Sequence, residues 1–469
     1  MGATTDLAEA PNRDAPPARG LWAEVRGLAV LAGPITLSQV GLHMMGFVDT
    51  AMVGRLGATS LAAVGIGNGI YFSLSVASMG VIFGMDPLVS QAIGAGESAR
   101  ARSILWQAVR LALLISVPTM ALVALAAMLV GYVGIDPETS HQIWRFLLGR
   151  LPNIVPFLIF TACRSYLQAI GRTRAILWAT VWANIANVVG NILFIYGDEG
   201  LAWFGLPRVG LPPLGVLGSG LASSIASVAT VVVAGREVVR VSGKPRAADL
   251  RPDSATMRSI ARLGMPIGVH LISEVGAFSL VGILAGRLGP EVAAGHQVAL
   301  GLASMSFTVA LGLANATAVQ VGHAVGRGDT LGARRAGFVG IVASLVVMGV
   351  PAIAFAAAPY ACARILSDKP EIIVAALPLI RIAALFQLWD GSQAVASGAL
   401  RGAGDTRSAQ FANMAGYYLL GLPLALLLGF GMGFGAVGFW WGLSAALAVI
   451  SVGLVIQFWR VSSRDIQRA

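Results

Sequence analysis

Apolar segments of about 20 residues recur along nearly the whole chain, with short polar stretches between them. A helix needs roughly 20 consecutive apolar residues to cross the hydrocarbon core of a membrane. Hydrophobic residues make up 56% of the chain and charged residues only 12%, whereas about a quarter of a typical soluble domain is charged. The sequence therefore predicts an all-α polytopic membrane protein.

The apolar segments predict twelve membrane-spanning helices, at residues 28–52, 61–85, 104–130, 143–163, 177–197, 215–235, 260–285, 293–317, 337–358, 372–397, 410–430 and 436–458. The segments 1–27 and 459–469 are expected to be tails. The first of them contains Pro, Asp, Glu and Arg, but no apolar core followed by a cleavage site. We therefore expect no cleaved signal peptide.

The basic residues indicate which side of the membrane each loop occupies. Most of the 32 Lys and Arg residues fall in the tails and in the loops on one side of the predicted spans. The opposite side is assigned few cations, namely Arg55, Arg145, Arg150, Arg208, Arg287, Arg364 and Lys369. Loops rich in Lys and Arg usually stay in the cytoplasm, so both termini are expected there. The same distribution explains the net charge of +10 without a nucleic-acid partner.

The sequence also matches itself at an offset of 232 residues. The stretch GRLG at 54–57 falls on GRLG at 286–289, AIGAGESARAR at 92–102 falls on AVGRGDTLGAR at 324–334, and Pro34 falls on Pro266. Further along, LQAIGRTR at 167–174 falls on LRGAGDTR at 400–407, and LGVLG at 214–218 falls on FGAVG at 434–438. The repeat predicts two pseudo-symmetric six-helix bundles.

These bundles are expected to be an N-terminal lobe at 28–235 and a C-terminal lobe at 260–458, joined by a basic cytoplasmic linker at 236–259. Each lobe has an even number of spans, so both insert in the same direction. They are then related by an axis along the membrane normal, as in transporters whose halves rock around a central site. A repeat of this kind favours a transporter over a channel or a membrane enzyme.

Four acidic residues fall inside the predicted spans or directly at the end of one: Asp49, Asp86, Glu274 and Asp390. A charged side chain at the centre of a membrane costs about 2.5 to 3.5 kcal/mol on insertion scales, and such residues usually mark ion or substrate pathways. None of the four is duplicated in the other half, so the repeat itself does not require them. The alternative is a neutral carboxyl that hydrogen-bonds neighbouring helices together. Asp86, near a span end, could instead cap the backbone or pair with a loop Arg.

Polar side chains share helix faces with two of these acids, because residues three or four apart on a helix are neighbours. His270 lies one turn before Glu274, and Phe386 and Gln387 lie about one turn before Asp390. Carboxylates and carboxamides supply oxygen ligands that suit a hard cation, whereas a lone desolvated carboxyl suits a proton. His270 could be a ligand, a proton relay or a hydrogen-bonded contact between helices.

The chain contains no Walker A sequence, no metalloprotease motif and no G-x-S-x-G motif. A membrane-embedded enzyme would need catalytic groups clustered at the membrane surface, and the sequence has no Asp-rich or His-rich motif of that kind. We therefore expect neither enzymatic activity nor a cofactor, apart from a coupling ion.

Several stretches together resemble the MATE family, the multidrug and toxic compound extrusion transporters, and in particular its bacterial NorM branch. They are MGFVDTAMVGRLG at 45–57, PLVSQAIGAG at 87–96, NVVGNILFIYG at 187–197, AAGHQVAL at 293–300 and DGSQAVASGALRGAGDT at 390–406. The resemblance extends over about residues 28–460.

The resemblance implies two cation sites, one in each half. The first maps onto Asp49, Asn187 and Asn191, and the second onto Glu274 and Asp390. Relatives can have Tyr one turn before the second aspartate, but this chain has Phe386, which keeps the ring and lacks the hydroxyl.

The resemblance further implies a monomeric transporter in the inner membrane of a bacterium, surrounded by lipids. It would export organic, often cationic compounds in antiport with Na⁺ or H⁺. The ligand count in the second half favours Na⁺ at Glu274 and Asp390, because Gln387 and Gln393 add oxygen atoms nearby. A lipid-linked precursor flippase of the same superfamily is the alternative, although its central cavity would be cationic.

Overall fold

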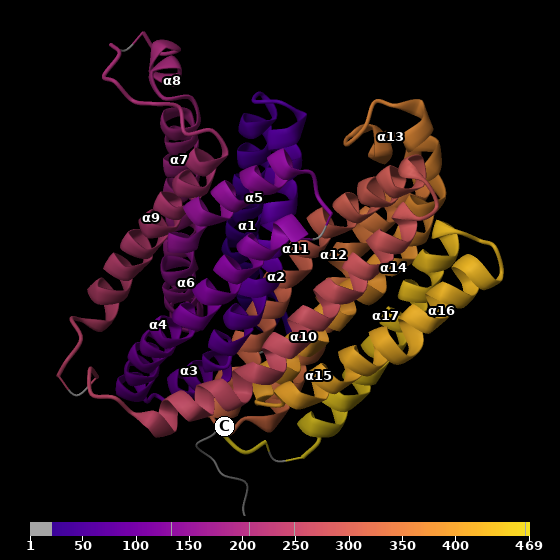
Figure 1. The fold of residues 1–469 in the computed structure, drawn as a ribbon. Helices are drawn as coiled ribbons and strands as arrows, with labels where there is room; N and C mark the ends of the chain where they lie inside the picture. Colours follow the sequence, from indigo (N-terminus) through magenta and orange to yellow (C-terminus); the bar gives the residue numbers. More distant parts are fainter. Residues whose placement is uncertain (1–20, 133, 206, 248, 465) are drawn as a thin grey trace, which may run out of the picture.

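The computed structural model describes residues 21–132, 134–205, 207–247, 249–464 and 466–469 (Figure 1). Within these residues the chain is almost entirely helical, as the sequence predicts. Twelve helical segments of the described chain are long and apolar enough to cross a membrane, and each overlaps one predicted span. The all-α prediction is therefore confirmed. Residues 1–20 of the expected N-terminal tail lie outside the described residues.

The helices of the first half are α1 (Leu21–Gly54), α2 (Ala58–Ile82), α3 (Met85–Gly94), α4 (Ser98–Leu129), α5 (Pro137–Arg150), α6 (Ile154–Ala169), α7 (Thr173–Tyr196), α8 (Asp198–Ala202) and α9 (Val216–Ser242). Those of the second half are α10 (Ser254–Gly286), α11 (Pro290–Gly326), α12 (Thr330–Ala357), α13 (Pro359–Arg364), α14 (Pro370–Ala403), α15 (Thr406–Ala415), α16 (Leu422–Leu426) and α17 (Ala436–Ser462). Short 3₁₀ turns follow α4 and α5. Two π-helical segments, Gly416–Gly421 and Leu427–Gly431, flank α16.

The internal repeat of the sequence reappears in the backbone. Pro34 and Pro266 both lie inside the first long helix of their half. Gly57 and Gly289, which match in the repeat, have φ angles of 120° and 121°. Only glycine adopts this conformation readily, because it has no Cβ atom. The matched sequences thus build the same turns in both halves.

The two halves pack tightly against each other at one end of the molecule. The helix α2 lies against α10, while α1 and α3 lie against α11. A Cβ atom placed on Gly84 would lie 2.5 Å from the backbone nitrogen of Gly264, and one on Gly80 would lie 2.4 Å from the Cα atom of Gly268. Small residues therefore let the helix backbones approach closely, as in other membrane bundles.

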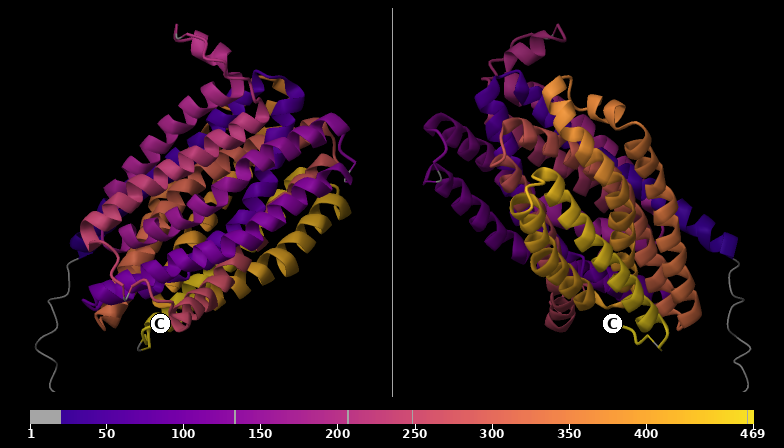
Figure 2. Two further views of the ribbon diagram at one scale, coloured as in Figure 1. Left: turned by 60° about the vertical axis from the view of Figure 1, so that its left-hand side comes forward. Right: turned by 90° about the vertical axis from the view of Figure 1, so that its right-hand side faces the viewer.

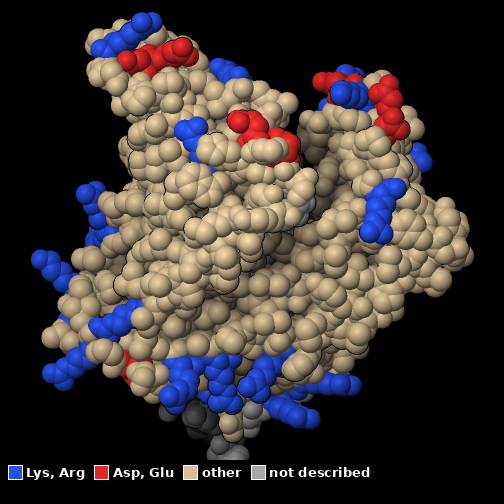
Figure 3. Space-filling model, viewed as in Figure 1, with Lys and Arg blue, Asp and Glu red and all other residues tan. Residues whose placement is uncertain are grey.

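The closed end is also the basic end, which carries the connection between α9 and α10 and the C-terminus (Figures 1 and 2). Lys and Arg side chains gather along this end in the space-filling view (Figure 3). The short helices α8 and α13 stand at the opposite end, called the far end below. Figure 3 shows a hollow between the two halves toward the far end. The molecule is thus closed at the basic end and open at the far end.

The predicted linker, residues 236–259, begins inside α9 and ends inside α10, since α9 ends at Ser242 and α10 begins at Ser254. The connection between them is fastened to α4. Arg102 Nε lies 2.9 Å from Asp249 Oδ2, and Gln107 Nε2 donates to the carbonyl oxygen of Arg251 at 2.9 Å. The segment that joins the halves is therefore anchored on the first one.

Candidate functional site

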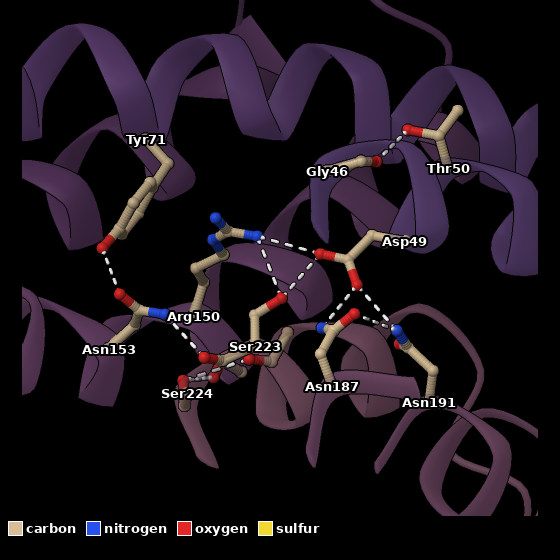
Figure 4. A network of polar contacts seen from close by, with 12 residues as sticks. Gly46, Asp49, Thr50, Tyr71, Arg150, Asn153, Asn187, Asn191, Ser223 and Ser224 are labelled. Carbon is tan, nitrogen blue, oxygen red and sulfur yellow. Dashed lines mark hydrogen bonds and ion pairs between the residues drawn. The ribbon is translucent and has the colours of Figure 1, made fainter. Parts of the chain in front are cut away.

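The carboxylate of Asp49 lies at the centre of a polar network inside the first half (Figure 4). Its Oδ1 atom accepts hydrogen bonds from Nδ2 of Asn187 at 2.8 Å and from Nδ2 of Asn191 at 2.7 Å. Its Oδ2 atom accepts a bond of 2.7 Å from the hydroxyl of Ser223. All four residues are buried, so the helices α1, α7 and α9 meet at one desolvated carboxylate. The structure thus brings together the three residues that the sequence analysis grouped here.

Arg150, at the end of α5, completes this network. Its Nη1 atom lies 3.5 Å from Asp49 Oδ2 and donates to the Ser223 hydroxyl at 3.2 Å. The guanidinium carbon also lies 4.6 Å from the centre of the Tyr71 ring. Arg150, counted from the sequence among the cations of the side opposite the basic loops, instead lies within the membrane-spanning segment Pro137–Ala169. Its side chain is only 15% exposed and faces a buried acid.

A second layer of hydrogen bonds holds these groups in place. The Tyr71 hydroxyl donates to Oδ1 of Asn153 at 2.7 Å. Asn153 Nδ2 in turn donates to the carbonyl oxygen of Ser223 at 2.9 Å and to the Ser227 hydroxyl at 3.0 Å. The turn between α5 and α6 thereby fixes both the ring under Arg150 and the serine beside Asp49 (Figure 4).

In the second half, Glu274 lies on α10 one turn before Phe278 and Asp390 lies on α14 one turn after Phe386, and the centres of these two rings are 6.0 Å apart. The Nε2 atom of His270 lies 3.4 Å from Oε2 of Glu274, one turn along the same helix. The side chains of both residues are largely buried, with exposed fractions of 11% and 13%. This pair lies within α10, so it is not a contact between helices.

Gln387 and Phe386 flank Asp390 on α14, and all three are buried. Among the described residues, neither Oε1 nor Nε2 of Gln387 has a hydrogen-bond partner. A buried amide without partners costs about 1 to 3 kcal/mol. Gln393, in contrast, donates to Oδ1 of Asn413 at 2.7 Å, so its amide nitrogen is already used. Of the two glutamines, Gln387 has both of its polar atoms available for a ligand.

Tyr417 brings a hydroxyl to this second cluster from the first π-helical segment. It is fully buried, and its hydroxyl has no partner in the described part of the chain. Its ring meets that of Phe278, one turn after Glu274 on α10, with the ring centres 6.0 Å apart. π-helical segments often occur at functional sites. Tyr417 thus places a hydroxyl in the cluster where Phe386 has none.

Asp86 lies away from both clusters, where the halves meet at the basic end. Its Oδ2 atom is 3.5 Å from Nε of Arg401, and Arg401 also donates to Oδ1 of Asn315 at 2.7 Å. The guanidinium groups of Arg164 and Arg401 both lie over the ring of Phe83, at 5.3 and 5.4 Å. Asp86 therefore pairs with an Arg across the halves, and that Arg belongs to a helix rather than a loop.

Sequence reasoning did not select Arg150, Ser223 or Tyr417 for these sites. Ser223 lies in a stretch of small residues, and Tyr417 is one of two adjacent tyrosines inside the predicted span 410–430. No group of three or more His, Cys, Asp and Glu side chains in the described residues could hold a metal ion. The second cluster instead offers two carboxylates, an amide and a hydroxyl. Oxygen atoms of this kind suit a hard cation such as Na⁺.

A family model described as MatE matches residues 34–193 and 266–427 of the chain. The two matches fall on the two halves of the internal repeat. A relative from Deinococcus radiodurans, named probable multidrug resistance protein NorM, is 36% identical over 449 residues, which cover 93% of this chain and 95% of that protein. A protein of the same name from Pseudomonas aeruginosa is 34% identical, with coverages of 94% and 90%.

Solved structures share the fold at lower sequence identity. The crystal structure of the eukaryotic MATE transporter AtDTX14 superposes with a TM-score of 0.80 at 21% identity, and covers 95% of this chain and 100% of that one. An outward-facing multidrug resistance MATE family transporter gives a TM-score of 0.84 at 17% identity, with coverages of 94% and 96%. These structures support the fold and its division into two six-helix halves.

Proposed function

Because the chain belongs to the MatE family, we propose that it exports organic, often cationic compounds in exchange for inward-moving Na⁺ or H⁺. The observation that carries this proposal is the presence of acidic side chains in the interior of both halves. They are Asp49 in the first half, and Glu274 and Asp390 in the second. Buried acids inside a membrane usually mark the path of an ion or a substrate.

Exchange follows from the charge of these sites. A carboxylate neutralised by a coupling ion no longer attracts an organic cation, so the binding of one ligand weakens the binding of the other. Each ligand then favours the conformation in which its own contacts are stronger. The hollow at the far end and the tight packing at the basic end correspond to one of the two conformations that such an exchange requires.

We assign Na⁺ as the coupling ion and the second half as its site. Two neighbouring carboxylates repel each other, and a cation between them removes that repulsion. The unpartnered oxygen atoms of Gln387 and Tyr417 would complete the coordination together with Glu274 and Asp390. A proton would need only one of these groups.

The available energy limits the stoichiometry. A tenfold Na⁺ gradient supplies about 1.4 kcal/mol, and each charge that crosses a potential of 100 mV adds about 2.3 kcal/mol. Exchange of one Na⁺ for one monovalent organic cation moves no net charge, so only the chemical part remains. Strong concentration of a cationic compound therefore favours more than one coupling ion for each molecule exported.

The relatives from bacteria and the basic end of the molecule support a location in the inner membrane, with the basic end in the cytoplasm. The hollow at the far end then opens to the periplasm. Cysteines introduced singly at Asp198 and Arg246 test this orientation, since an impermeant thiol reagent applied to whole cells should label only the first.

Transport in proteoliposomes tests the proposed function. Purified protein should move ethidium against its gradient when an inward Na⁺ gradient is imposed at fixed pH. No movement under either a Na⁺ or an H⁺ gradient would contradict the proposal. Movement driven by a pH jump alone, with no effect of Na⁺, would replace Na⁺ by H⁺. If a lipid-linked precursor moved and ethidium did not, the flippase alternative would take its place.

A further inference from the structure

The guanidinium of Arg150 lies beside the carboxylate of Asp49 in the polar network of the first half. Its Nη1 atom lies 3.5 Å from the Asp49 carboxylate and 3.2 Å from the Ser223 hydroxyl. The aromatic rings of Tyr71 and Phe146 lie 4.6 and 5.7 Å from the guanidinium carbon, within the range of a cation–π contact. The first half therefore neutralises its own buried acid with a cation of the protein itself (Figure 4).

The fold does not require an arginine at this position. The neighbouring stretches of the repeat have offsets of 232 and 233, so Arg150 matches Ile382 or Ala383 in the second half. Both of those residues are buried and apolar. In the second half a single helix, α14, runs through this position without a guanidinium, and among the described residues no Arg forms an ion pair with Glu274 or Asp390. Arg150 is thus specific to the Asp49 site.

The contact between Arg150 and Asp49 is looser than a structural clamp. Charge-assisted hydrogen bonds of arginine usually measure about 2.7 to 2.9 Å and often use two nitrogens in parallel. Here a single nitrogen approaches, at 3.5 Å. The buried Nε atom of Arg150 has no partner among the described residues. The two asparagines and Ser223 approach the carboxylate at 2.7 to 2.8 Å, and thus more closely than the guanidinium does at 3.5 Å.

We propose that Arg150 is a tethered cation that competes with the transported cation for Asp49 and moves aside when the first half loads. The proposal rests on the proposed function. It makes Arg150 a residue that determines specificity, because a ligand must bind Asp49 better than the guanidinium does. A planar, delocalised organic cation can also use the Tyr71 and Phe146 rings, which gives it an advantage over a small hydrated ion.

Binding of tetraphenylphosphonium to the full-length protein in lipid nanodiscs tests this competition, with calorimetry as the readout. Arg150→Gln removes the charge and keeps a polar side chain that can reach Ser223. We expect it to bind the probe about tenfold more tightly than the wild type. Arg150→Lys keeps the charge but lacks the planar guanidinium, so we expect a smaller increase in affinity for the probe. In an Asp49→Asn background, Arg150→Gln should change the affinity little, because the shared partner is gone.

Thermal melting shows whether each variant is folded. If folded Arg150→Gln and Arg150→Lys bind the probe no better than the wild type, Arg150 supports the site instead of competing for it, and the proposal is overturned. If Arg150→Gln does not fold, Arg150→Lys decides by the same criterion. If the wild type exports the probe and the Arg150 variants bind it with unchanged affinity, the competition is overturned and the proposed function is not. A wild-type protein that neither binds nor exports it overturns the proposed function.

Discussion

The two halves share one fold, but the side chains that surround their buried acids differ. Asp49 in the first half accepts hydrogen bonds from two asparagines and a serine and lies 3.5 Å from Arg150. Asp390 in the second half has a second acid, Glu274, in its surroundings, on the helix whose Phe278 ring meets that of Phe386. The Asp49 carboxylate already has four donors around it, although Asn191 Oδ1 and Arg150 Nε lack a partner among the described residues. In the second cluster, the polar atoms of Gln387 and the hydroxyl of Tyr417 all lack one, and a cation would satisfy their oxygens.

This difference indicates which ligand binds at each site. In the first half, an incoming cation must replace a partner that is already present. In the second half, an incoming cation provides a partner for polar atoms that have none. Binding there removes the free-energy cost of burying those atoms unpaired, and no existing contact has to be broken. We therefore infer that the second half controls ion binding and that the first half selects among organic cations.

The largest expected effect comes from neutralising the second site. Glu274→Gln and Asp390→Asn keep the size of each side chain and remove its charge. Each should reduce Na⁺-driven ethidium efflux from proteoliposomes to the level of protein-free liposomes, because the cation loses half of its charged ligands. Glu291→Gln, at an exposed position in the first turn of α11, is the matched control and should transport normally. Efflux at the wild-type rate in both site variants would make these acids structural.

Tyr417→Phe should have the next largest effect. It removes one hydroxyl from the second cluster and keeps the ring that packs against Phe278. The affinity for Na⁺ should fall about tenfold, since a hydrogen bond or ligand to a charged group contributes roughly 1.5 kcal/mol or more. The Na⁺ concentration for half-maximal efflux measures this change. The control is Tyr418→Phe, whose hydroxyl donates to the Ser273 carbonyl at 3.1 Å. An equal shift in both variants would argue against a ligand role for Tyr417.

A smaller effect is expected from the pair that joins the halves at the basic end. Asp86→Asn and Arg401→Ala each remove one partner of the 3.5 Å contact and should slow efflux about two- to fivefold. Loss of the contact makes the conformation that is closed at the basic end less stable, while both cation clusters stay intact. Transport rates of these two variants should be compared with that of Arg240→Ala. This control breaks the pair between the exposed Arg240 and Glu237. Unchanged rates in both variants would show that the glycine contacts alone close this end.

The smallest effect concerns Asp198 at the far end, outside the membrane-spanning segments. The backbone N–H groups of Val209, Leu211 and Gly210 donate to its carboxylate and lower its pKa. The folded loop therefore binds a proton less tightly than the unfolded loop. These contacts contribute stability above the ordinary Asp pKa of about 3.9, and the contribution is lost as the pH falls through the lowered pKa.

Amide hydrogen exchange in residues 207–211 reports on this loop. Asp198→Asn should speed exchange at neutral pH and leave transport unchanged, whereas Glu199→Gln should change neither. Exchange that is as slow in Asp198→Asn as in the wild type would show that the loop does not depend on this carboxylate.

Much of this arrangement could be predicted from the sequence. The lengths of the apolar segments determine the twelve helices, and the repeat at an offset of 232 determines the two halves. The asparagine stripe at Asn187 and Asn191 could be placed beside Asp49 only through the family resemblance, because periodicity shows which residues share a face and not which helix that face meets.

The partners that come from other helices could not be predicted. Arg150 lies inside the predicted span 143–163 but is counted with the cations of one membrane side, and only the packing of α5 against α2 and α9 shows that it turns inward. Ser223 is one of several small residues that suit close helix packing equally well. Tyr417 reaches the second cluster because a π-helical segment shifts the face of its helix, and the sequence gives no measure of that shift.

Direct Na⁺ binding tests the difference between the two halves most directly. Calorimetric titration of Na⁺ into the purified protein at constant pH should be compared for the wild type, Asp49→Asn, Glu274→Gln and Asp390→Asn. We expect Asp49→Asn to bind Na⁺ as the wild type does, and Glu274→Gln and Asp390→Asn to lose binding. Loss of Na⁺ binding in Asp49→Asn, with binding retained in Glu274→Gln and Asp390→Asn, would place the ion in the first half and contradict the account.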